Sequence, residues 1–509
     1  MPINRKAPID DSKIKRLMKN KLTEMFCSKI PLALVIAVFV IDFAAAQKIE
    51  VIVSSQAGDR LFRKSDATFS ADAKPSSAII SVDEKKSFQT IEGFGATFNE
   101  AGMICLNSLS AEKRNNVLES MFDSVEGAGF TAMKSPIAAC DFASGGPWYS
   151  YDETPGDTLM NHFSIERDLG ANGLITFIKA ASRFGKFQIE SPMDFAPDWM
   201  YYSMNQGEKH VKPEYYSALA RYYSRYLKSY LENGVHIDYL NLFNEANNTW
   251  YSNVTYKEMS EMIKGYVMPQ LKKDGLNVKI QFGETANRPE AMEKFPVALD
   301  DKDLQKYIHS LTVHGYDWDK FSILTDLHNR YPDLPIYMTE VCYASPNNLA
   351  PDRPRGMPVY EFSDGEFWGN MIVNDLKNWV SAWIYWNMIL DENGGPWLVS
   401  TAHGDPENNR QHPVVIINRT TKEVAYTGLY YYLSHFSRFV RPGAKRIDCA
   451  GNSKQLNVVG FKNADNSIVV NIINNGGDTN SKIYWNNKSF IQNFPAHSIT
   501  TLKWNTDNH

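Results

Sequence analysis

The stretch IDYLNLFNE, residues 237–245, is an apolar run that ends in an amide and a carboxylate. The stretch LPIYMTE, residues 334–340, follows the same plan and also ends in a glutamate. Short runs rich in β-branched and aromatic residues predict buried strands. We therefore predict two strands with a carboxylate at the end of each.

The rest of the central segment, from about Thr90 to about Leu398, alternates strand-like runs with helical stretches such as Pro213–Leu231 and Tyr256–Lys272. This alternation favours repeated βα units around a parallel sheet. Eight such strands close a (β/α)8 TIM barrel, which is the α/β fold that we predict. The eight predicted strands are Ile91–Ala96, Thr131–Ile137, Phe187–Ser191, Ile237–Phe243, Val278–Phe282, Leu311–Val313, Ile336–Met338 and Ala382–Trp386.

Short strands flank the barrel on both sides along the chain. Ile49–Val53 and Ala78–Val82 precede it. The later runs, separated by Asn, Gly and Asp turns, are Val414–Ile417, Leu456–Phe461, Ser467–Ile473, Lys482–Trp485 and Thr500–Trp504. This spacing is typical of an antiparallel β-sandwich, and we expect the N-terminal strands to join the same side domain. The predicted domains are 1–46 (signal peptide), 47–89 (N-terminal sandwich strands), 90–413 (catalytic barrel) and 414–509 (C-terminal sandwich).

The N-terminus carries a targeting pattern. Basic and polar residues through Lys29 are followed by the apolar run Ile30–Ile41 and then by Ala44–Ala46, which predicts a signal peptide cleaved near Gln47. An uncleaved anchor is the alternative, although the run is short for a membrane span. Met25 is an alternative start. We expect a secreted or periplasmic, cell-envelope protein with no stable membrane span after cleavage.

Composition and charge narrow the classes of partner. The chain has 509 residues, 43% of them hydrophobic and 22% charged, with a net charge of -5 and a pI of about 6.2. Such a balance gives no electrostatic basis for binding nucleic acid. Outside the signal, the four cysteines are scattered and form no metal-ligand spacing, so we predict neither a metal nor a cofactor. Disulfide pairing and oligomeric state stay open. The cysteines are Cys105, Cys140, Cys342 and Cys449.

Active sites of such barrels lie at the carboxyl ends of the strands, so polar residues that end apolar runs are the informative ones. Two of them, Glu245 and Glu340, end the predicted fourth and seventh strands. Two facing carboxyl groups can protonate a glycosidic oxygen and attack the anomeric carbon. We assign Glu245 as acid/base and Glu340 as nucleophile. Asn244 could donate a hydrogen bond to the sugar 2-hydroxyl. The plainer alternative is that each glutamate is an ordinary residue after a strand. The full set of strand-end candidates is Glu100, Asp141, Glu245, Glu284, His314, Tyr316, Glu340, Trp386 and Asn387.

An ordered series of motifs runs from about residue 88 to the C-terminus. The motifs are Glu92–Ala96, Pro136–Ala143, Tyr151–Asp157, Asn244-Glu245, Val313–Tyr316, Thr339–Cys342, Trp386-Asn387, Gly394–Pro396 and Tyr432–Phe439. In this order they resemble the glucosylceramidase family, glycoside hydrolase family 30. The resemblance implies a clan A retaining mechanism on the same two glutamates.

The resemblance also implies which residues line the subsite for the non-reducing sugar: Asp141, Asn244, Tyr316 and Trp386. Asp141 would accept hydroxyl hydrogen bonds, Tyr316 would hold the nucleophile, and Trp386 would form a platform under the ring. Cys342 would be a wall of the pocket. We count Lys134 and His314 among the candidate substrate-binding residues as well.

The departures from the family concern the pocket around the sugar. Lys134 stands where an arginine is common and cannot make a planar two-pronged contact. Met193 replaces a tryptophan, and the adjacent Asp194 adds a carboxylate. Gly315 replaces another tryptophan and opens space, and Ala246 replaces the proline after the acid/base glutamate. None of these changes involves Glu245 or Glu340.

The sequence leaves more than one function open. The first hypothesis is a retaining β-glycosidase on β-glucosides or related β-linked glycans, with fucosidase, xylosidase or β-1,6-glucanase specificity as variants. True glucosylceramidase activity would need an apolar patch near the mouth, for which the segment Trp148–Tyr151 is a candidate. The alternatives are a catalytically silent carbohydrate-binding protein and a purely structural exported protein.

Overall fold

The fold is that of a computed structural model, which describes residues 47–64, 66–70, 78–143, 148–205, 207–248, 252–342, 358–396 and 409–506. The predicted signal peptide, residues 1–46, lies outside these ranges. Among the described residues, no helix combines the length and the apolar character that crossing a membrane requires.

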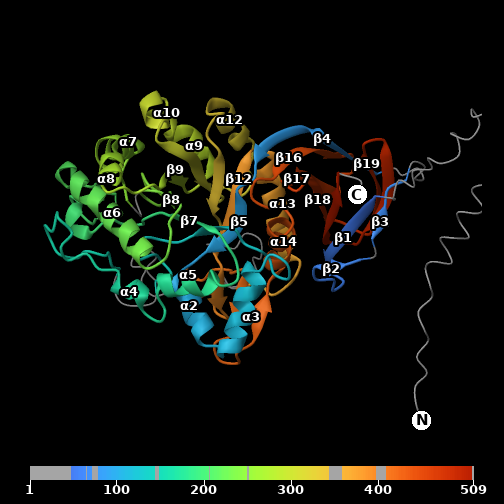
Figure 1. The fold of residues 1–509 in the computed structure, drawn as a ribbon, viewed down its shortest axis with the longest axis horizontal. Helices are drawn as coiled ribbons and strands as arrows, with labels where there is room; N and C mark the ends of the chain where they lie inside the picture. The colour runs from blue at the N-terminus through green and yellow to red at the C-terminus, as the bar shows by residue number, and fades with distance from the viewer. Residues whose placement is uncertain are drawn as a thin grey trace, which may run out of the picture. The chain divides into compact units, whose positions relative to one another are not determined.

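Eight parallel strands close into a barrel, as the sequence predicted. Around the barrel they follow the order β10-β11-β12-β5-β6-β7-β8-β9. Helices, among them α6, α9 and α12, lie outside the strands (Figure 1). The barrel strands are β5 (Gly93–Thr97), β6 (Ala132–Lys134), β7 (Gln188–Ser191), β8 (Tyr239–Leu240), β9 (Lys279–Thr285), β10 (Ile308–His314), β11 (Ile336–Glu340) and β12 (Val380–Asn387).

Strand β8 is shorter than its apolar sequence suggested. Only Tyr239 and Leu240 pair in regular ladders with β7 and β9. Beyond them the chain still follows the end of β7, because the amide of Asn244 donates to the carbonyl of Met193 at 2.8 Å. Glu245 has a positive φ of 43°, a conformation that extended strands do not use. The chain therefore leaves the ladder before it reaches the predicted acid/base residue.

The predicted helices are present with local variations. The helical stretch predicted from Tyr256 is divided by a wider π turn at Ile263–Val267, because Pro269 has no N–H to donate to the carbonyl of Gly265. The helices are α2 (Glu100–Asn107), α3 (Ala111–Phe122), α4 (Glu166–Leu169), α5 (Leu174–Ala181), η1 (Asp198–Met200), η2 (Pro213–Tyr215), α6 (Tyr216–Glu232), α7 (Tyr256–Met262), η3 (Ile263–Val267), α8 (Met268–Lys273), α9 (Arg288–Lys294), α10 (Pro296–Leu299), α11 (Lys302–Gln305), α12 (Ser322–Arg330), α13 (Asp364–Lys377) and α14 (Gly428–Ser437).

The side domain combines strands from both ends of the described chain, which confirms the predicted arrangement. Its strands follow the order β2-β1-β21-β18-β17-β16-β4-β19-β20, with β3 paired to β1. The pairs are antiparallel except β4 with β19, which is parallel. Its own apolar core contains Phe69, Trp485 and Trp504. The strands are β1 (Lys48–Ser55), β2 (Phe62–Arg63), β3 (Ala67–Thr68), β4 (Ile79–Thr90), β16 (Lys445–Gly451), β17 (Leu456–Lys462), β18 (Ser467–Asn474), β19 (Thr479–Trp485), β20 (Lys488–Phe494) and β21 (Ser498–Asn505).

One predicted sandwich strand belongs elsewhere. Val415–Ile417 forms β14, which pairs with β13 (Ile389–Asp391) and β15 (Val424–Tyr426) in a separate three-stranded sheet. The helix α14 follows it, and the strands of the side domain resume only at Lys445. The predicted C-terminal domain, 414–509, therefore starts too early. A short apolar run reveals a strand but not its partner strand, which is why the sequence could not place it.

Candidate active site

The two predicted catalytic glutamates meet at the barrel mouth. Glu340 is the last residue of β11, and Glu245 follows β8. One carboxylate oxygen of each, together with a ring nitrogen of His314, lie within 4.8 Å of one another. Carboxyl groups of retaining glycosidases are about 5–5.5 Å apart, whereas inverting enzymes need roughly 6.5–9.5 Å to admit a water. The spacing therefore fits double displacement.

Glu340 is held by hydrogen bonds to both carboxylate oxygens. Its Oε1 accepts from the Tyr316 hydroxyl at 2.8 Å, and its Oε2 accepts from Lys134 Nζ at 2.9 Å. Burial raises the pKa of Tyr316 well above its ordinary value, so this phenol stays a proton donor. The contact with Tyr316 is the one that the resemblance implied. Two donors fix the plane of the carboxylate, as a nucleophile requires.

Lys134, at the end of β6, lies beneath this carboxylate and is fully buried. Its Nζ donates to Glu284 Oε2 at 2.6 Å, to Glu340 Oε2 at 2.9 Å and to Asn244 Oδ1 at 3.3 Å. Burial lowers its pKa, but the negative charges of Glu284 and Glu340 outweigh burial and raise the pKa overall. All three ammonium protons have protein acceptors. Lys134, which we predicted to bind substrate, is thus engaged by the protein itself.

His314, at the end of β10, joins both predicted catalytic residues to the buried Glu284. Its Nδ1 lies 3.1 Å from Glu245 Oε1, and its Nε2 lies 3.2 Å from Glu284 Oε2. Burial lowers the pKa of His314, but the charges of Glu340 and Glu284 outweigh it and raise the pKa to about 10. The imidazole is therefore protonated at neutral pH and donates from both nitrogens. Glu245, His314 and Glu340 are also spaced so that they could hold a metal ion, and His314 would have to lose a proton to become a ligand.

Glu284 is the residue of this network to which the sequence gave no role. It accepts from Lys134, His314 and the Thr339 hydroxyl. Burial raises its pKa, but the positive charges of Lys134 and His314 outweigh burial and hold the pKa below its ordinary value. Its positive φ of 51° is a strained conformation for a residue with a side chain. A buried anion thus anchors the two cations, Lys134 and His314, that contact the predicted catalytic pair.

The pKa of Glu245 is raised, whereas that of Glu284 is lowered. Burial raises the pKa of Glu245, and the hydrogen bond and charge of His314 reduce this effect without cancelling it. Its backbone is fixed in part through the carbonyl of Leu242, which accepts from the Tyr223 hydroxyl of α6 at 2.5 Å. A carboxyl group with a raised pKa beside a hydrogen-bonded anion is the asymmetry that separates a proton donor from a nucleophile.

The predicted sugar subsite lies beside the pair. Burial, and then the charge of Glu340, raise the pKa of Asp141 to about 7. Its Oδ2 accepts from Asn409 and Gln411, each at 3.4 Å. These two residues were missed, because they belong to no predicted element. Burial and the charge of Asp141 raise the pKa of Asp194 well above its ordinary value. The carboxyl group that this chain gains at Asp194 is therefore close enough to Asp141 to be affected by its charge.

The remaining predicted residues complete the pocket. The Trp386 ring centroid lies 5.4 Å from Lys134 Nζ, and the Trp386 amide donates to the carbonyl of Val341. Because Asn244 Oδ1 accepts from Lys134, its Nδ2 is left to face a ligand. Cys342 Sγ donates to Gln411 Oε1 at 3.1 Å, as expected of a pocket wall.

Removing the buried ammonium is expected to destabilise the fold. Lys134→Met would leave two buried carboxylates, Glu284 and Glu340, to share the single positive charge of His314, at a cost of about 3–5 kcal/mol in the free energy of unfolding. Denaturant unfolding measures this, with the exposed Lys320→Met as control, because a surface ion pair contributes about 0–1 kcal/mol. Adding Glu284→Gln should restore part of the loss. A Lys134→Met protein as stable as wild type would contradict the network.

This barrel, with two carboxylates at its mouth at the spacing of double displacement, defines a retaining β-glycoside hydrolase of clan A. Comparison with known proteins names the family. Residues 91–440 match the glycosyl hydrolase family 30 TIM-barrel domain, and residues 443–502 match the family 30 β-sandwich domain. The chain belongs to glycoside hydrolase family 30.

Three relatives indicate the range of the family. Putative glucosylceramidase 2 of Caenorhabditis elegans is 30% identical over 82% of this chain and 80% of its own. An endo-1,6-β-D-glucanase of Neurospora crassa is 26% identical over 76% of this chain and 79% of its own. The crystal structure of SrfJ from Salmonella typhimurium has the same fold, with a TM-score of 0.79 at 23% identity over 90% of this chain and 100% of that one.

Proposed function

We propose that the protein hydrolyses β-linked glucosides with Glu340 as nucleophile and Glu245 as acid/base. In the first step, Glu340 attacks the anomeric carbon while the bond to the leaving oxygen breaks and Glu245 gives its proton to that oxygen. A covalent glucosyl ester remains on Glu340. In the second step, Glu245 takes a proton from water, whose oxygen attacks the anomeric carbon and releases Glu340. The observation that carries this proposal is the spacing of the two carboxylates.

The surrounding residues would act before and during the transition state. Tyr316 and Lys134 would keep the Glu340 carboxylate aimed at the anomeric carbon. The free amide of Asn244 would donate to the sugar 2-hydroxyl, a contact that strengthens as the ring flattens. Asp141, held by Asn409 and Gln411, would accept hydrogen bonds from other hydroxyls of the sugar.

A glucosyl unit is the sugar that the relatives support best. A putative glucosylceramidase and an endo-1,6-β-D-glucanase differ in the group that they release but agree on a β-linked glucosyl unit. We therefore assign glucose to the subsite of Asp141. Lys134 and Asp194, two of the positions at which this chain departs from the family pattern, both belong to the pocket proposed for this sugar.

A panel of nitrophenyl glycosides tests the assignment. We expect kcat/KM to be highest for the β-glucoside, at least about tenfold above the β-xyloside and the β-fucoside, because each lost or misplaced hydroxyl leaves a buried polar group unpaired at a cost of about 1–3 kcal/mol. The α-glucoside serves as control and should not react. A higher kcat/KM for the xyloside or the fucoside would overturn the assignment of glucose, and no turnover of any β-glycoside would overturn the function.

A further inference from the structure

A groove outside the catalytic cluster has the size of a ligand site. It encloses about 600 Å³ and lies between helix α3, the hairpin β14–β15 and Tyr360, which precedes α13. Ligand pockets measure about 300–1,000 Å³. None of the residues that line it belongs to the network around Glu245 and Glu340. We call it the α3 groove.

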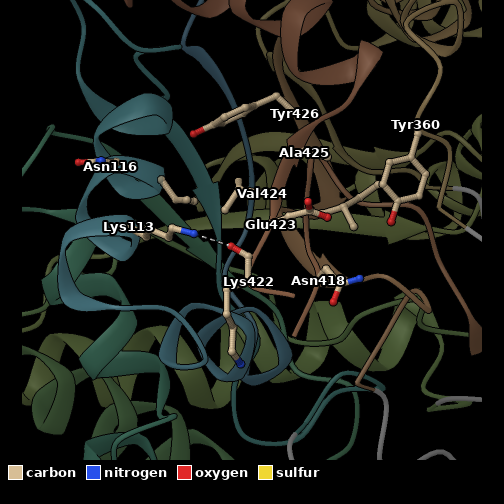
Figure 2. A pocket seen from close by; sticks show the side chains of 11 residues that line it. Lys113, Asn116, Tyr360, Asn418, Lys422, Glu423, Val424, Ala425 and Tyr426 are labelled. Carbon is tan, nitrogen blue, oxygen red and sulfur yellow. Dashed lines mark hydrogen bonds between the residues drawn. The ribbon is translucent and has the colours of Figure 1, made fainter. Parts of the chain in front are cut away.

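The side chains that line the α3 groove combine rings with amides. Tyr360 is 54% exposed, an unusual state for a large aromatic residue. In Figure 2, Lys113 and Asn116 of α3 lie on one side of the groove, Tyr360 on the other, and Tyr426 along a further edge. Rings offer flat apolar faces, and amides both donate and accept hydrogen bonds. Sugars present the matching pair of surfaces, C–H faces and hydroxyl edges.

The groove is held in shape by contacts between its walls. Lys113 Nζ donates to the carbonyl of Lys422, which ties α3 to the hairpin at 3.0 Å (Figure 2). Asn418 Oδ1 accepts from the backbone amides of Thr420 and Thr421, so its Nδ2 is the end left for a ligand. The Tyr426 ring packs on Tyr430 with centroids 4.6 Å apart. A preformed site loses less entropy when it binds.

The chain itself connects the groove to the sugar subsite. Gln411 contacts Asp141, and Ile416 of β14, five residues later, lines the groove. Five residues span at most about 18 Å. Between them, His412 Nδ1 accepts from the amide of Val359, which fixes the residue next to Tyr360. The backbone positions of Gln411 and Ile416 are therefore at most about 18 Å apart, a distance that a ligand of several sugar rings can span.

We propose that the α3 groove is a second glycan-binding site, which holds a β-linked glucan chain while another part of the same chain is cleaved. This inference rests on the proposed function and extends it to polymeric substrates. The charged residues of the groove are Lys113, Lys422 and Glu423. Both ammonium groups already donate to backbone carbonyls, Lys113 to Lys422 and Lys422 to Arg419, so the rings and amides of the lining suit a neutral glycan best.

The experiment compares a short and a long substrate on full-length protein. Tyr360→Ala should lower kcat/KM on a linear β-1,6-glucan by roughly fivefold, the effect of losing one aromatic contact, and leave kcat/KM on nitrophenyl β-glucoside within twofold of wild type. Tyr484→Ala, at a tyrosine of β19 that is 38% exposed, is the control outside the groove and should change neither. Asn116→Ala, on the opposite wall, should act in the same direction as Tyr360→Ala. It decides the question if Tyr360→Ala fails to fold.

Binding separates this inference from the proposed function. Titration of a β-1,6-linked glucan hexasaccharide into Glu340→Gln should show weaker affinity once Tyr360→Ala is added. If wild type cleaved no β-glucoside, the proposed function would fail, while a loss of hexasaccharide binding in Tyr360→Ala would still support the groove. Equal effects on both substrates, no effect on either, or binding of inorganic phosphate in place of the glucan would overturn the second site.

Discussion

Glu340→Ala is expected to lower kcat on nitrophenyl β-glucoside by about 10⁴-fold or more, the order seen when a member of a covalent catalytic constellation is removed. The cause is the loss of the carboxylate that forms the glucosyl ester in the proposed mechanism. The substitution also removes one of the three acceptors of Lys134, which still pairs with Glu284, so the free energy of unfolding is measured alongside to separate lost catalysis from lost stability. Steady-state kinetics and denaturant unfolding on the same preparation measure both.

Azide gives this prediction a chemical control. In Glu340→Ala, azide can enter the space of the missing carboxylate and attack the anomeric carbon from that face, so the product should be the α-glucosyl azide. Glu290→Ala on α9, which pairs with Lys294, is a control glutamate outside the network and should keep wild-type turnover. If Glu340→Ala kept normal turnover and azide had no effect on it, another group would have to form the ester.

Glu245→Ala is expected to lower kcat/KM by about 10²–10⁴-fold on glucosides whose leaving group needs a proton, the usual contribution of a general acid. Nitrophenyl β-glucoside should lose much less in the first step, because nitrophenolate leaves without protonation. Azide should then give the β-glucosyl azide, since Glu340 still forms the ester and azide attacks from the vacated side. Equal losses on both leaving groups would contradict an acid role for Glu245.

The pH profile follows from the same residue. Burial raises the pKa of Glu245, so its proton is kept to a higher pH than in an ordinary glutamate. Activity should therefore fall as pH rises through this raised pKa, and Glu245→Gln should remove that limb of the profile. Burial and the charge of Glu340 raise the pKa of Asp141 to about 7, so Asp141 can also contribute a basic limb, and Asp141→Asn separates its contribution. A basic limb unchanged in Glu245→Gln would assign it to another group.

The periodicity of the sequence was sufficient to predict the barrel. Apolar runs such as Ile336–Met338 mark strands wherever they are buried, and closure of the sheet then brings the strand ends to one mouth. The same argument predicted that Glu245 and Glu340 lie together at the mouth, as the structure shows. It failed for Val415–Ile417, which is equally apolar but pairs with β13, because apolar character does not specify a partner strand.

The charges inside the mouth were harder to predict. Lys134 looked like an imperfect replacement for an arginine that contacts substrate, but its three protons are taken by Glu284, Glu340 and Asn244. Glu284 was recognised only as a polar residue at a strand end. Which acid pairs with which base depends on distances across the barrel, and no local pattern encodes them. Gln411 carried no signal, because it reaches Asp141 from a segment outside any predicted element.

Trapping the intermediate tests the central claim most directly. A 2-deoxy-2-fluoro-β-glucosyl fluoride should inactivate the enzyme, because the fluorine destabilises the oxocarbenium-like transition states while the good leaving group still lets the ester form. Mass spectrometry of the digested protein should then find one fluoroglucosyl group, on the peptide that contains Glu340. A label on a different residue, or continued inactivation of Glu340→Ala at the wild-type rate, would contradict the account.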